Sequence, residues 1–431
     1  MELNILPGNK MFKVVETFSG IGAQAKALNR IGIDFDIVNT CDWDVNAMIA
    51  YAQIHKNGLE IAQYKEVPDD EIDDFLKHTT LSMDGKKAAS TKVINNLTKD
   101  FKRIVYSAIK QTNNFVSIKD VKGQDIKDGI DLLTYSFPCQ DLSLCGCWHG
   151  NKTGISRTAN NRSGLLWEVE RILKEMHDLD KELPHFLMME NVTNILSATH
   201  KKDFDEWKNT LSELGYFNKI YKLNAKNFGV PQKRERAYMI SVFVGKNDSI
   251  RKLVELFFTN NNLEDLTVSD KYKSRIFKLK NVLKLDYSQN KYKYEADINQ
   301  PNNTPSRVKI FEDNDLLYNG KEINEICVNT LTTKQDRNPN SGTIFYDSLR
   351  EGKARWRYLT PRECFILMGF DEKDYEKVVS CNPLYNGKNI LFTNEKLTKL
   401  AGNSICVDVL EAIFKQIYQL NELIKQYEAV I

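Results

Sequence analysis

The feature that most constrains the fold is an apolar run, residues 130–135, that is soon followed by the turn Pro138-Cys139-Gln140. A short apolar run without helical spacing predicts a buried β-strand. Proline fixes φ and removes a backbone donor, so the turn holds the thiol in one direction. In an α/β sheet, ligands bind beyond the carboxyl ends of the strands. The run therefore predicts an α/β fold with Cys139 at the mouth of the sheet, and the plain alternative is a small buried thiol.

A second apolar segment, residues 14–18, runs into a glycine turn at Gly20 and Gly22. Good helix formers follow at residues 24–28. Glycines let a backbone approach a ligand closely, and the first turn of a helix favours polar or anionic groups. Many α/β proteins turn this way with nothing bound, so the interpretation as a ligand site needs support from the next strand.

That strand, predicted over residues 35–40, is followed by Asp42 and Trp43. An acidic residue at this position binds the two hydroxyls of a ribose, and an indole offers a flat face for adenine. Asp125, followed by Ile126, precedes the 130–135 strand and is predicted to reach the adenine amine. These residues indicate a cofactor that carries adenosine. The full Gly-x-Gly-x-x-Gly pattern is absent, which favours a cofactor without a pyrophosphate but leaves a dinucleotide and S-adenosylmethionine both open.

Polar motifs adjoin two further predicted strands. Residues 186–189 end in Glu190 and Asn191, and a glutamate at the end of a central strand tends to a raised pKa and can donate a proton. Gln232, Arg234 and Arg236 precede the strand at 237–244. Alternate residues of an extended segment face the same way, so these three are predicted to grip a carbonyl oxygen and phosphates. Solvated side chains are the plain alternative for both motifs.

In their linear order these motifs resemble those of the DNA cytosine-5 methyltransferases. The matching segments are residues 18–22 (cofactor loop), 137–140 (start of the catalytic loop), 162–168, 190–192 (Glu-Asn-Val), 232–236 (Gln-x-Arg-x-Arg), 358–369 and 402–404 (Gly-Asn-Ser). The last of them leads into a helix predicted over 407–418. The resemblance covers residues 13–244 and 353–418.

The resemblance implies a class I S-adenosylmethionine-dependent methyltransferase fold, which is an α/β fold with a Rossmann-like mixed sheet and a smaller target-recognition domain. It divides the chain into a catalytic and cofactor-binding part (1–244), a target-recognition domain (245–352) and a return segment (353–431) that completes the catalytic domain. The net charge of +2 does not argue for nucleic acid. Residues 271–293, however, hold eight basic residues against one acidic residue, with tyrosines interleaved, which is typical of a nucleic-acid surface. A separate insert, residues 58–115, is predicted to be helical with a loop at 80–90.

The implied reaction transfers a methyl group from S-adenosyl-L-methionine to C5 of a flipped cytosine in duplex DNA and leaves S-adenosyl-L-homocysteine. Cys139 would attack C6, Glu190 would hold N3 and the exocyclic amine, and Arg236, next to Arg234, would reach O2. The implied cofactor contacts are Phe18, Ser19, Gly20, Ile21, Gly22, Ala23, Asp42, Trp43, Asp125, Ile126, Pro138, Leu165, Asn403, Ser404 and Ile405. The implied DNA contacts are Phe137, Gln140, Ser143, Arg162, Asn191, Gln232, Thr330, Thr332 and Arg337.

The chain departs from the family pattern at a few positions. Glu16 stands where the family usually has aspartate, and Ala23 replaces a frequent glycine. Cys145 and Cys147 lie in the catalytic loop, and with Cys139 and His149 they suggest a metal site as a rival interpretation. Their spacing lacks the Cys-x₂₋₄-Cys pairing of structural zinc, so no metal is predicted.

Two alternatives to a DNA methyltransferase stay open. One is an RNA-directed relative with the same chemistry, whose best-known form has a much smaller recognition region. The other is a catalytically silent regulator, which the presence of Cys139, Glu190 and both motif arginines disfavours. Irregularly spaced cysteines and the lack of a long apolar run predict a cytoplasmic protein without a membrane segment. Its expected partner is double-stranded DNA, and a cognate restriction endonuclease in the same system would form no stable complex with a monomeric enzyme.

Overall fold

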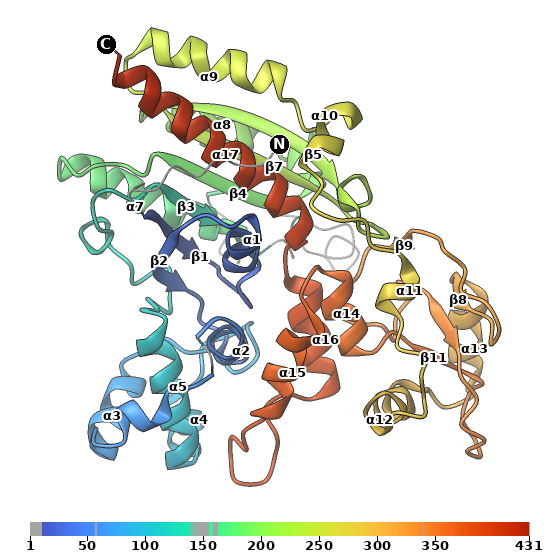
Figure 1. The fold of residues 1–431 in the computed structure, drawn as a ribbon. Helices are drawn as coiled ribbons and strands as arrows, with labels where there is room; N and C mark the ends of the chain where they lie inside the picture. Colours follow the sequence, from blue (N-terminus) through green and yellow to red (C-terminus); the bar gives the residue numbers. More distant parts are fainter. Residues whose placement is uncertain are drawn as a thin grey trace.

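The structure, a computed structural model, describes residues 11–56, 58–138, 142, 155–157, 163–338 and 340–430. A six-stranded sheet is built from β1 (Phe12–Thr17), β2 (Phe35–Cys41), β3 (Leu132–Tyr135), β4 (Phe186–Val192), β5 (Tyr216–Asn224) and β7 (Glu235–Phe243). The strand order is β2-β1-β3-β4-β7-β5 (Figure 1). The first four strands in this order pair in parallel, whereas β7 runs antiparallel to both of its neighbours. The predicted α/β class with a mixed sheet is confirmed.

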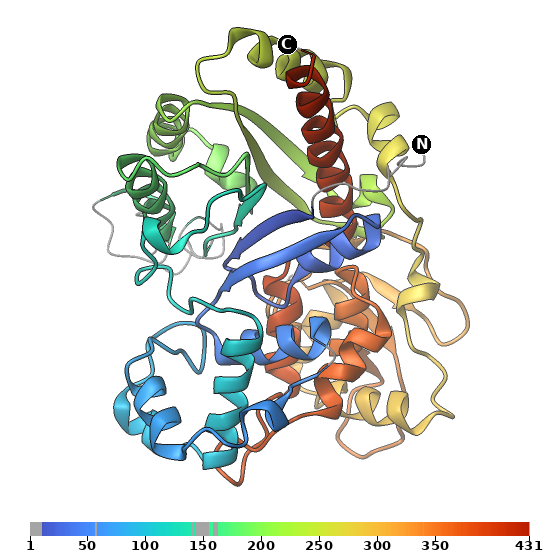
Figure 2. The same ribbon diagram turned by 60° about the vertical axis from the view of Figure 1, so that its left-hand side comes forward.

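Helices cover both faces of this sheet because its strands are apolar on both sides. Neighbouring residues of a strand point to opposite faces, so Val14 and Val15 belong to two separate cores. The first core contains α1 (Ala23–Ile31), α2 (Val45–His55) and the long α17 (Val407–Glu428), while α7 (Leu166–Asp178) and α8 (Lys201–Glu213) pack into the second. Figure 2 shows α17 lying along the sheet next to α1.

The strand ends that carry the predicted motifs meet at one edge of the sheet. The parallel strands finish there, and β7 begins there because it runs the other way. Strand β4 continues to Val192, three residues beyond the predicted end at Met189, because β7 pairs with Glu190, Asn191 and Val192. Strand β5 has no counterpart among the predicted strands. The pairing places Arg236 opposite Val192, next to the Glu190 position.

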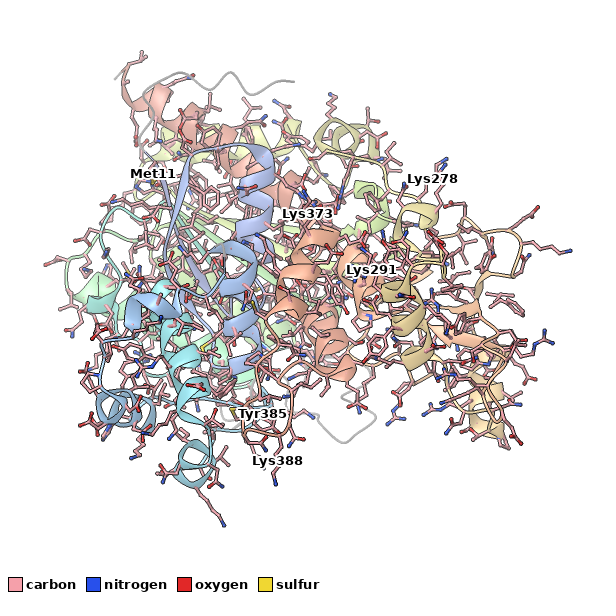
Figure 3. The ribbon with its side chains drawn as sticks, turned by 60° about the horizontal axis from the view of Figure 1, so that its bottom comes forward. Met11, Lys278, Lys291, Lys373, Tyr385 and Lys388 are labelled. Atoms are coloured by element: carbon pink, nitrogen blue, oxygen red, sulfur yellow. The ribbon has the colours of Figure 1, made fainter. Side chains whose placement is uncertain are left out.

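The insert, residues 58–115, is helical as predicted. Its elements are the 3₁₀ turn η1 (Ile61–Tyr64) and the helices α3 (Asp69–Lys77), α4 (Thr91–Asn95) and α5 (Lys99–Gln111). A loop connects α3 to α4, in agreement with the predicted loop at 80–90. The insert packs on α2 and on the turn at 381–393, where the Thr98 amide donates to the Tyr385 carbonyl at 3.2 Å. Figure 3 shows Tyr385 and Lys388 of this turn next to the insert helices.

A smaller unit lies beside the large sheet (Figure 1). It contains a three-stranded sheet of β8 (Leu316–Tyr318), β10 (Thr343–Phe345) and β11 (Trp356–Tyr358), with helices α11 (Leu279–Val282), α12 (Asn290–Asn299) and α13 (Pro305–Glu312). The short strands β6 (Gln232–Lys233) and β9 (Val328–Asn329) pair with each other. This pairing connects the unit to the segment that directly precedes β7.

The packing sets the limits of this unit differently from the predicted segment 245–352. Helices α9 (Asp248–Asn260) and α10 (Leu266–Tyr272) pack on β5, η5 (Ala225–Phe228) and α17. The Tyr272 hydroxyl, for example, donates to Gln419 of α17 at 2.9 Å. At the other end, β11 lies beyond residue 352 yet pairs with β10. Residues 248–272 therefore pack with the large sheet, because their apolar faces are buried there.

The remaining elements complete the frame of the site. They are the helices α14 (Pro361–Leu367), α15 (Glu372–Ser380) and α16 (Asn394–Asn403) and the 3₁₀ turns η2 (Gly123–Asp125), η3 (Ser163–Leu165) and η4 (Thr193–Leu196). Within the ranges that the structure describes, no helix is both long enough and apolar enough to cross a membrane.

Candidate active site

A cavity of about 520 Å³ opens at the edge of the sheet where the motif-bearing strand ends meet. It joins segments that lie far apart in the sequence. The predicted site residues that line it are Phe18, Ser19, Gly20, Ile21, Ala23, Asp42, Trp43, Phe137, Pro138, Leu165, Glu190, Asn191, Arg234, Arg236, Asn403, Ser404 and Ile405. The fold thus brings most of the predicted cofactor residues into one space with Glu190, Arg234 and Arg236.

Other predicted residues are not part of this lining. Gly22, Asp125, Ile126, Gln232, Thr330, Thr332 and Arg337 lie elsewhere in the structure. The predicted residues Cys139, Gln140, Ser143 and Arg162 lie outside the described residues, as do Cys145, Cys147 and His149 of the rival metal site. Among the residues that the structure does describe, no group of three or more His, Cys, Asp or Glu side chains could hold a metal ion.

Asp42 is held at the end of β2 by two backbone donors. Its carboxylate accepts from the Gly20 amide and from the Asp44 amide, both at 2.9 Å. Burial, together with the nearby charge of Asp44, raises the pKa of Asp42 to about 6, and the two amide hydrogen bonds oppose this rise. The carboxylate therefore connects the glycine loop to the start of α2 and is charged only above a mildly acidic pH.

Gly22 packs closely against α2, whereas the sequence predicted that a glycine here lets the backbone approach a ligand. Its backbone has φ +78°, and a Cβ added there would lie 2.3 Å from Nε2 of His55 and 2.7 Å from the Tyr51 ring. The His55 ring in turn lies 3.1 Å from the Ile21 carbonyl. The missing side chain lets the loop pack closely on α2, so the glycine serves this packing and does not face the cavity.

Asp125 and Ile126, the predicted adenine contacts, do not line the cavity. Asp125 is exposed and accepts from the Lys122 amide at 2.8 Å within η2, while Ile126 is buried in the core. The cavity is lined instead by residues 116–119. The Phe115 amide donates to the Thr40 carbonyl at 2.9 Å, which fixes this segment beside the end of β2. The available signal was the Val-Ser-Ile sequence that follows the last helix of the insert.

Glu190 occupies the other end of the cavity. Burial raises the pKa of Glu190, and the positive charges of Arg236 and Arg234 oppose the rise. The Arg236 Nε lies 3.4 Å from the Glu190 Oε1. Next to it, the Asn191 side-chain amide donates to the Phe137 carbonyl at 3.1 Å. This pair of acid and guanidinium is suited to bind a polar ring and to move a proton to it.

Gln232 and Arg234 are engaged by the protein, which differs from the prediction that they grip substrate groups. The Arg234 guanidinium donates to the carbonyls of Leu331, Gly402 and Ser404 at 2.9, 3.2 and 2.8 Å. The side-chain oxygen of Gln232 accepts from the backbone amide of Leu331 at 2.9 Å, and its side-chain nitrogen donates to the Leu367 carbonyl at 3.2 Å. The side chains of Gln232 and Arg234 therefore contact the segment around Leu331, and Arg234 also contacts the C-terminal end of α16. Arg236 is the one of the three whose side chain lies beside Glu190.

The residues around Leu331 are clamped between these elements. A Cβ on Gly402 would lie 2.4 Å from the Thr332 carbonyl oxygen, so only glycine permits this approach. The Thr330 hydroxyl donates to the Lys233 carbonyl at 2.6 Å, and the Thr332 hydroxyl donates to the Lys334 carbonyl at 2.7 Å. The Arg337 side chain, in contrast, is 63% exposed. Of the three predicted DNA contacts in this stretch, Arg337 is the one with a largely free surface.

The three hydrogen bonds from Arg234 to backbone carbonyls predict a large loss of stability for Arg234→Met. Burial lowers the pKa of Arg234 to about 10, so the guanidinium is still charged at neutral pH. Methionine leaves three buried carbonyl oxygens without their donor, and we expect a loss of about 3–5 kcal/mol in the free energy of unfolding, measured by urea denaturation. Lys233→Met, at the exposed neighbouring position, is the control and should change stability by less than about 0.5 kcal/mol. An Arg234→Met protein as stable as the control would contradict this role.

Comparisons with known proteins agree with the geometry. Residues 79–419 match the family of C-5 cytosine-specific DNA methylases. The orphan methyltransferase M.SssI of Spiroplasma monobiae is 34% identical over 427 residues, covering 95% of this chain and 97% of that protein. The type II methyltransferase M2.ScrFI of Lactococcus lactis subsp. cremoris is 32% identical over 412 residues, covering 95% and 99%.

Similarity to solved structures concerns the fold. The crystal structure of the Dnmt2 methyltransferase of S. pombe has a TM-score of 0.54 at 17% identity and covers 95% of this chain and 98% of that one. The predicted class I methyltransferase fold is therefore confirmed. Neither the family description nor the two named relatives support the RNA-directed alternative. Because the family match spans most of its length and two methyltransferases align with it almost end to end, the chain belongs to the C-5 cytosine-specific DNA methylases and is a DNA cytosine-5 methyltransferase.

Proposed function

We propose that this enzyme methylates C5 of a cytosine flipped out of duplex DNA, through a covalent bond between Cys139 and C6 of the base. The observation that carries the proposal is the single cavity that Asp42 and Trp43 line together with Glu190 and Arg236. A methyl donor at one end and a base at the other end would share this one space. A base within a stacked duplex cannot enter such a cavity, which is why flipping is required.

The residues at the Asp42 end fit an adenosine-carrying methyl donor. Enzymes of this family use S-adenosylmethionine, and it supplies an electrophilic methyl group when bound. The Asp42 carboxylate is positioned to accept from the ribose hydroxyls, and the Trp43 ring lines the same wall. Asn403 and Ser404, which line the cavity at the C-terminal end of α16, are polar groups for the amino-acid end.

The residues at the Glu190 end fit a cytosine ring. Protonated Glu190 can donate to N3, and its second oxygen can accept from the exocyclic amine. The raised pKa of Glu190 keeps the proton available at a higher pH than an ordinary glutamate would allow. The guanidinium of Arg236 can offset negative charge on O2. The Phe137 carbonyl accepts one hydrogen bond from Asn191, and its second lone pair is available for the amine.

The bond changes follow from the weak nucleophilicity of C5 in cytosine. The Cys139 thiolate forms a bond to C6 while Glu190 gives a proton to N3, and the resulting enamine carbon C5 takes the methyl group. A base then removes the proton from C5, the electrons of that C–H bond form the C5–C6 double bond and expel the thiolate from C6, and N3 returns its proton to Glu190. The thiol is regenerated, so the residue acts as a covalent catalyst.

Sequence recognition is assigned to the smaller unit. The catalytic motifs stop at Val244 and resume after Lys353, and the intervening surface is basic and aromatic. We assign phosphate contacts to exposed lysines such as Lys278, which Figure 3 shows projecting from this unit, and Lys280. Exposed Arg337 is the candidate for reading a base edge. Helices α9 and α10 are left out of this role because they pack on the large sheet.

Bisulfite sequencing tests the proposed reaction directly. DNA is taken from cells that lack other cytosine methyltransferases and express either this chain or no added protein. Protected cytosines within one short sequence context are expected only with the enzyme, and the same reads give the recognition sequence. Complete conversion of cytosines in DNA exposed to folded, expressed enzyme would refute the proposal.

A carboxylate at Asp42 predicts a pH-dependent cofactor affinity. Because the pKa of Asp42 is about 6, the ionised form that accepts from both hydroxyls is lost as the pH falls through that value. We therefore expect the Kd for S-adenosylmethionine, measured by calorimetry, to rise below about pH 6. Asp42→Asn should weaken binding by about 1.5–3 kcal/mol at pH 7.5, since it loses hydrogen bonds to a charged acceptor, and should remove this pH dependence. A variant with the pH profile of the wild-type enzyme would show that Asp42 does not bind the ribose.

A further inference from the structure

Part of the insert forms a wall of the cofactor cavity. Thr80, Gly85 and Ala88 line the same space as Trp43 and Asp44. They belong to the loop between α3 and α4, here called the insert loop (residues 80–89). We propose that this loop retains the bound cofactor and that Lys399 of α16 is the positioning residue that holds it in place. The inference rests on the proposed function, because the cofactor is taken to be S-adenosylmethionine.

Backbone hydrogen bonds attach the insert loop to the chain that follows β2. The Ser82 amide donates to the Trp43 carbonyl at 2.8 Å, and the Val45 amide donates to the Ser82 carbonyl at 2.9 Å. The side-chain amide of Asn46 adds a bond to the Met83 carbonyl at 3.1 Å. Because Trp43 is the proposed adenine contact, the loop extends the surface that faces the adenosine. The helices of the insert then hold the insert loop in position beside the cavity.

The insert loop is also fixed internally. The Asp84 carboxylate accepts from the amides of Lys86 and Lys87 at 2.8 and 3.1 Å. The Ser82 hydroxyl, which is fully buried, donates to the Lys87 carbonyl at 2.6 Å. These bonds close the chain into a compact turn. A turn of this kind moves as one body, so its position depends on the few contacts at its outer edge.

Lys399 of α16 connects the insert loop to the start of α2. Its ammonium group donates to the Asp84 carbonyl at 2.5 Å and to the Asp44 carboxylate at 3.1 Å. Asp44 also caps α2 by accepting from the Asn46 amide at 3.0 Å. The lysine therefore ties the insert loop to the start of α2 and to α16, the helix that leads to the cavity residues Asn403 and Ser404. Its side chain is 23% exposed, so the ion pair is partly shielded from solvent.

Two further contacts define how closely the loop fits. Gly85 has φ +65°, and a Cβ there would lie 2.4 Å from Asp44 Oδ2 and 3.0 Å from Lys399 Nζ. On the far side, the Thr80 hydroxyl donates to the Asp120 carboxylate at 3.0 Å, next to the lining segment 116–119. The loop thus spans the gap between the Asp44 side and the Ile118 side of the cavity. Opening it would expose the cofactor without moving Glu190 or Arg236.

Two variants test this inference. Lys399→Met removes the tie, and Gly85→Ala forces the loop away from Asp44. We expect each to speed dissociation of S-adenosylmethionine and S-adenosylhomocysteine in stopped-flow measurements and to raise the KM for S-adenosylmethionine by about three- to tenfold, because the closed loop is less populated. The effect should fall on this KM, whereas kcat at saturating cofactor and the KM for DNA stay within about twofold.

Matched controls separate loop opening from general damage. Lys396→Met removes another partly buried lysine of α16, whose ammonium lies over the Tyr385 ring at 5.3 Å. Gly387→Ala introduces the same backbone strain at φ +75°, but its Cβ would find only Thr98 Cγ2, at 3.7 Å. Both controls should keep the wild-type cofactor KM. Irreversibly unfolded or aggregated enzyme would lower activity equally at every cofactor concentration, and saturating cofactor would not restore it; reversible unfolding is excluded by a urea denaturation midpoint equal to that of the controls.

Two results would overturn the inference in different ways. If the wild-type enzyme binds S-adenosylmethionine but Lys399→Met and Gly85→Ala keep its dissociation rate and KM within twofold, the loop does not retain the cofactor. If the folded wild-type enzyme binds no S-adenosylmethionine in calorimetry, the proposed function itself fails, and this inference fails with it.

Discussion

Replacement of Cys139 by serine is expected to lower methyl transfer by about three or more powers of ten while S-adenosylmethionine binding stays close to that of the wild-type enzyme. In the proposed mechanism a thiolate attacks C6, and a serine hydroxyl is neither ionised at neutral pH nor comparably nucleophilic. Removing a covalent nucleophile normally costs several decades in rate. Cys139 directly follows Phe137 and Pro138, which line the cavity, whereas the ribose-binding candidate Asp42 comes from another strand.

The measurement is transfer of a labelled methyl group from S-adenosylmethionine to duplex DNA, with calorimetry for cofactor binding. Cys381→Ser is the matched control, because Cys381 is an exposed free thiol in the turn after α15, and this variant should keep full activity. A Cys139→Ser enzyme that retains more than about a tenth of the wild-type turnover would rule out the covalent mechanism.

A mechanism-based trap gives independent evidence for the covalent bond. Duplex DNA with 5-fluorocytosine at the target position should form a complex with the wild-type enzyme that survives denaturing electrophoresis. Fluorine cannot leave C5 as a proton does, so the thiolate is not expelled after methyl transfer. The same DNA should release the Cys139→Ser protein on denaturation.

Glu190→Gln is expected to lower kcat by about two to four powers of ten with little change in the Kd for the cofactor. Glutamine keeps the shape of the side chain but has no acidic proton for N3, and general acid catalysis contributes a factor of this size. In the wild-type enzyme the activity that depends on protonated Glu190 is present below the raised pKa of this group and is lost as the pH rises through it. The variant should lack this alkaline loss, which a pH–rate profile measures.

The stability of the Glu190→Gln enzyme provides the control. Because burial raises the pKa of Glu190, folding takes up a proton between the ordinary pKa and the raised one, and wild-type stability falls as the pH rises through that interval. Glutamine removes this dependence, so the variant should be at least as stable as the wild-type enzyme at neutral pH. A variant that loses activity in parallel with folded protein would point to a structural role for Glu190 in place of a catalytic one.

Much of this enzyme was predictable from local sequence. Apolar runs specify buried strands because only an α/β sheet covered on both faces buries them fully. Residues that directly follow such strands lie at one edge of the sheet, and Asp42, Trp43 and Glu190, which were expected at strand ends, all line the cavity there. The order of the motifs then indicated the family, which the comparisons confirm.

Only the tertiary structure decided what those side chains touch. Alternation gave Gln232, Arg234 and Arg236 a common side, but the carbonyls of Leu331, Gly402 and Ser404 come from segments roughly a hundred or more residues away, and they occupy Arg234. Similarly, spacing favoured Asp125 for the adenine amine, whereas pairing beside Thr40 brought residues 116–119 to the cavity. Local sequence determines which backbone forms a strand or a turn, because those preferences act over a few residues. The partner of each buried polar group, and the contribution of the insert loop to the cofactor wall, depend on contacts between distant segments that no local pattern encodes.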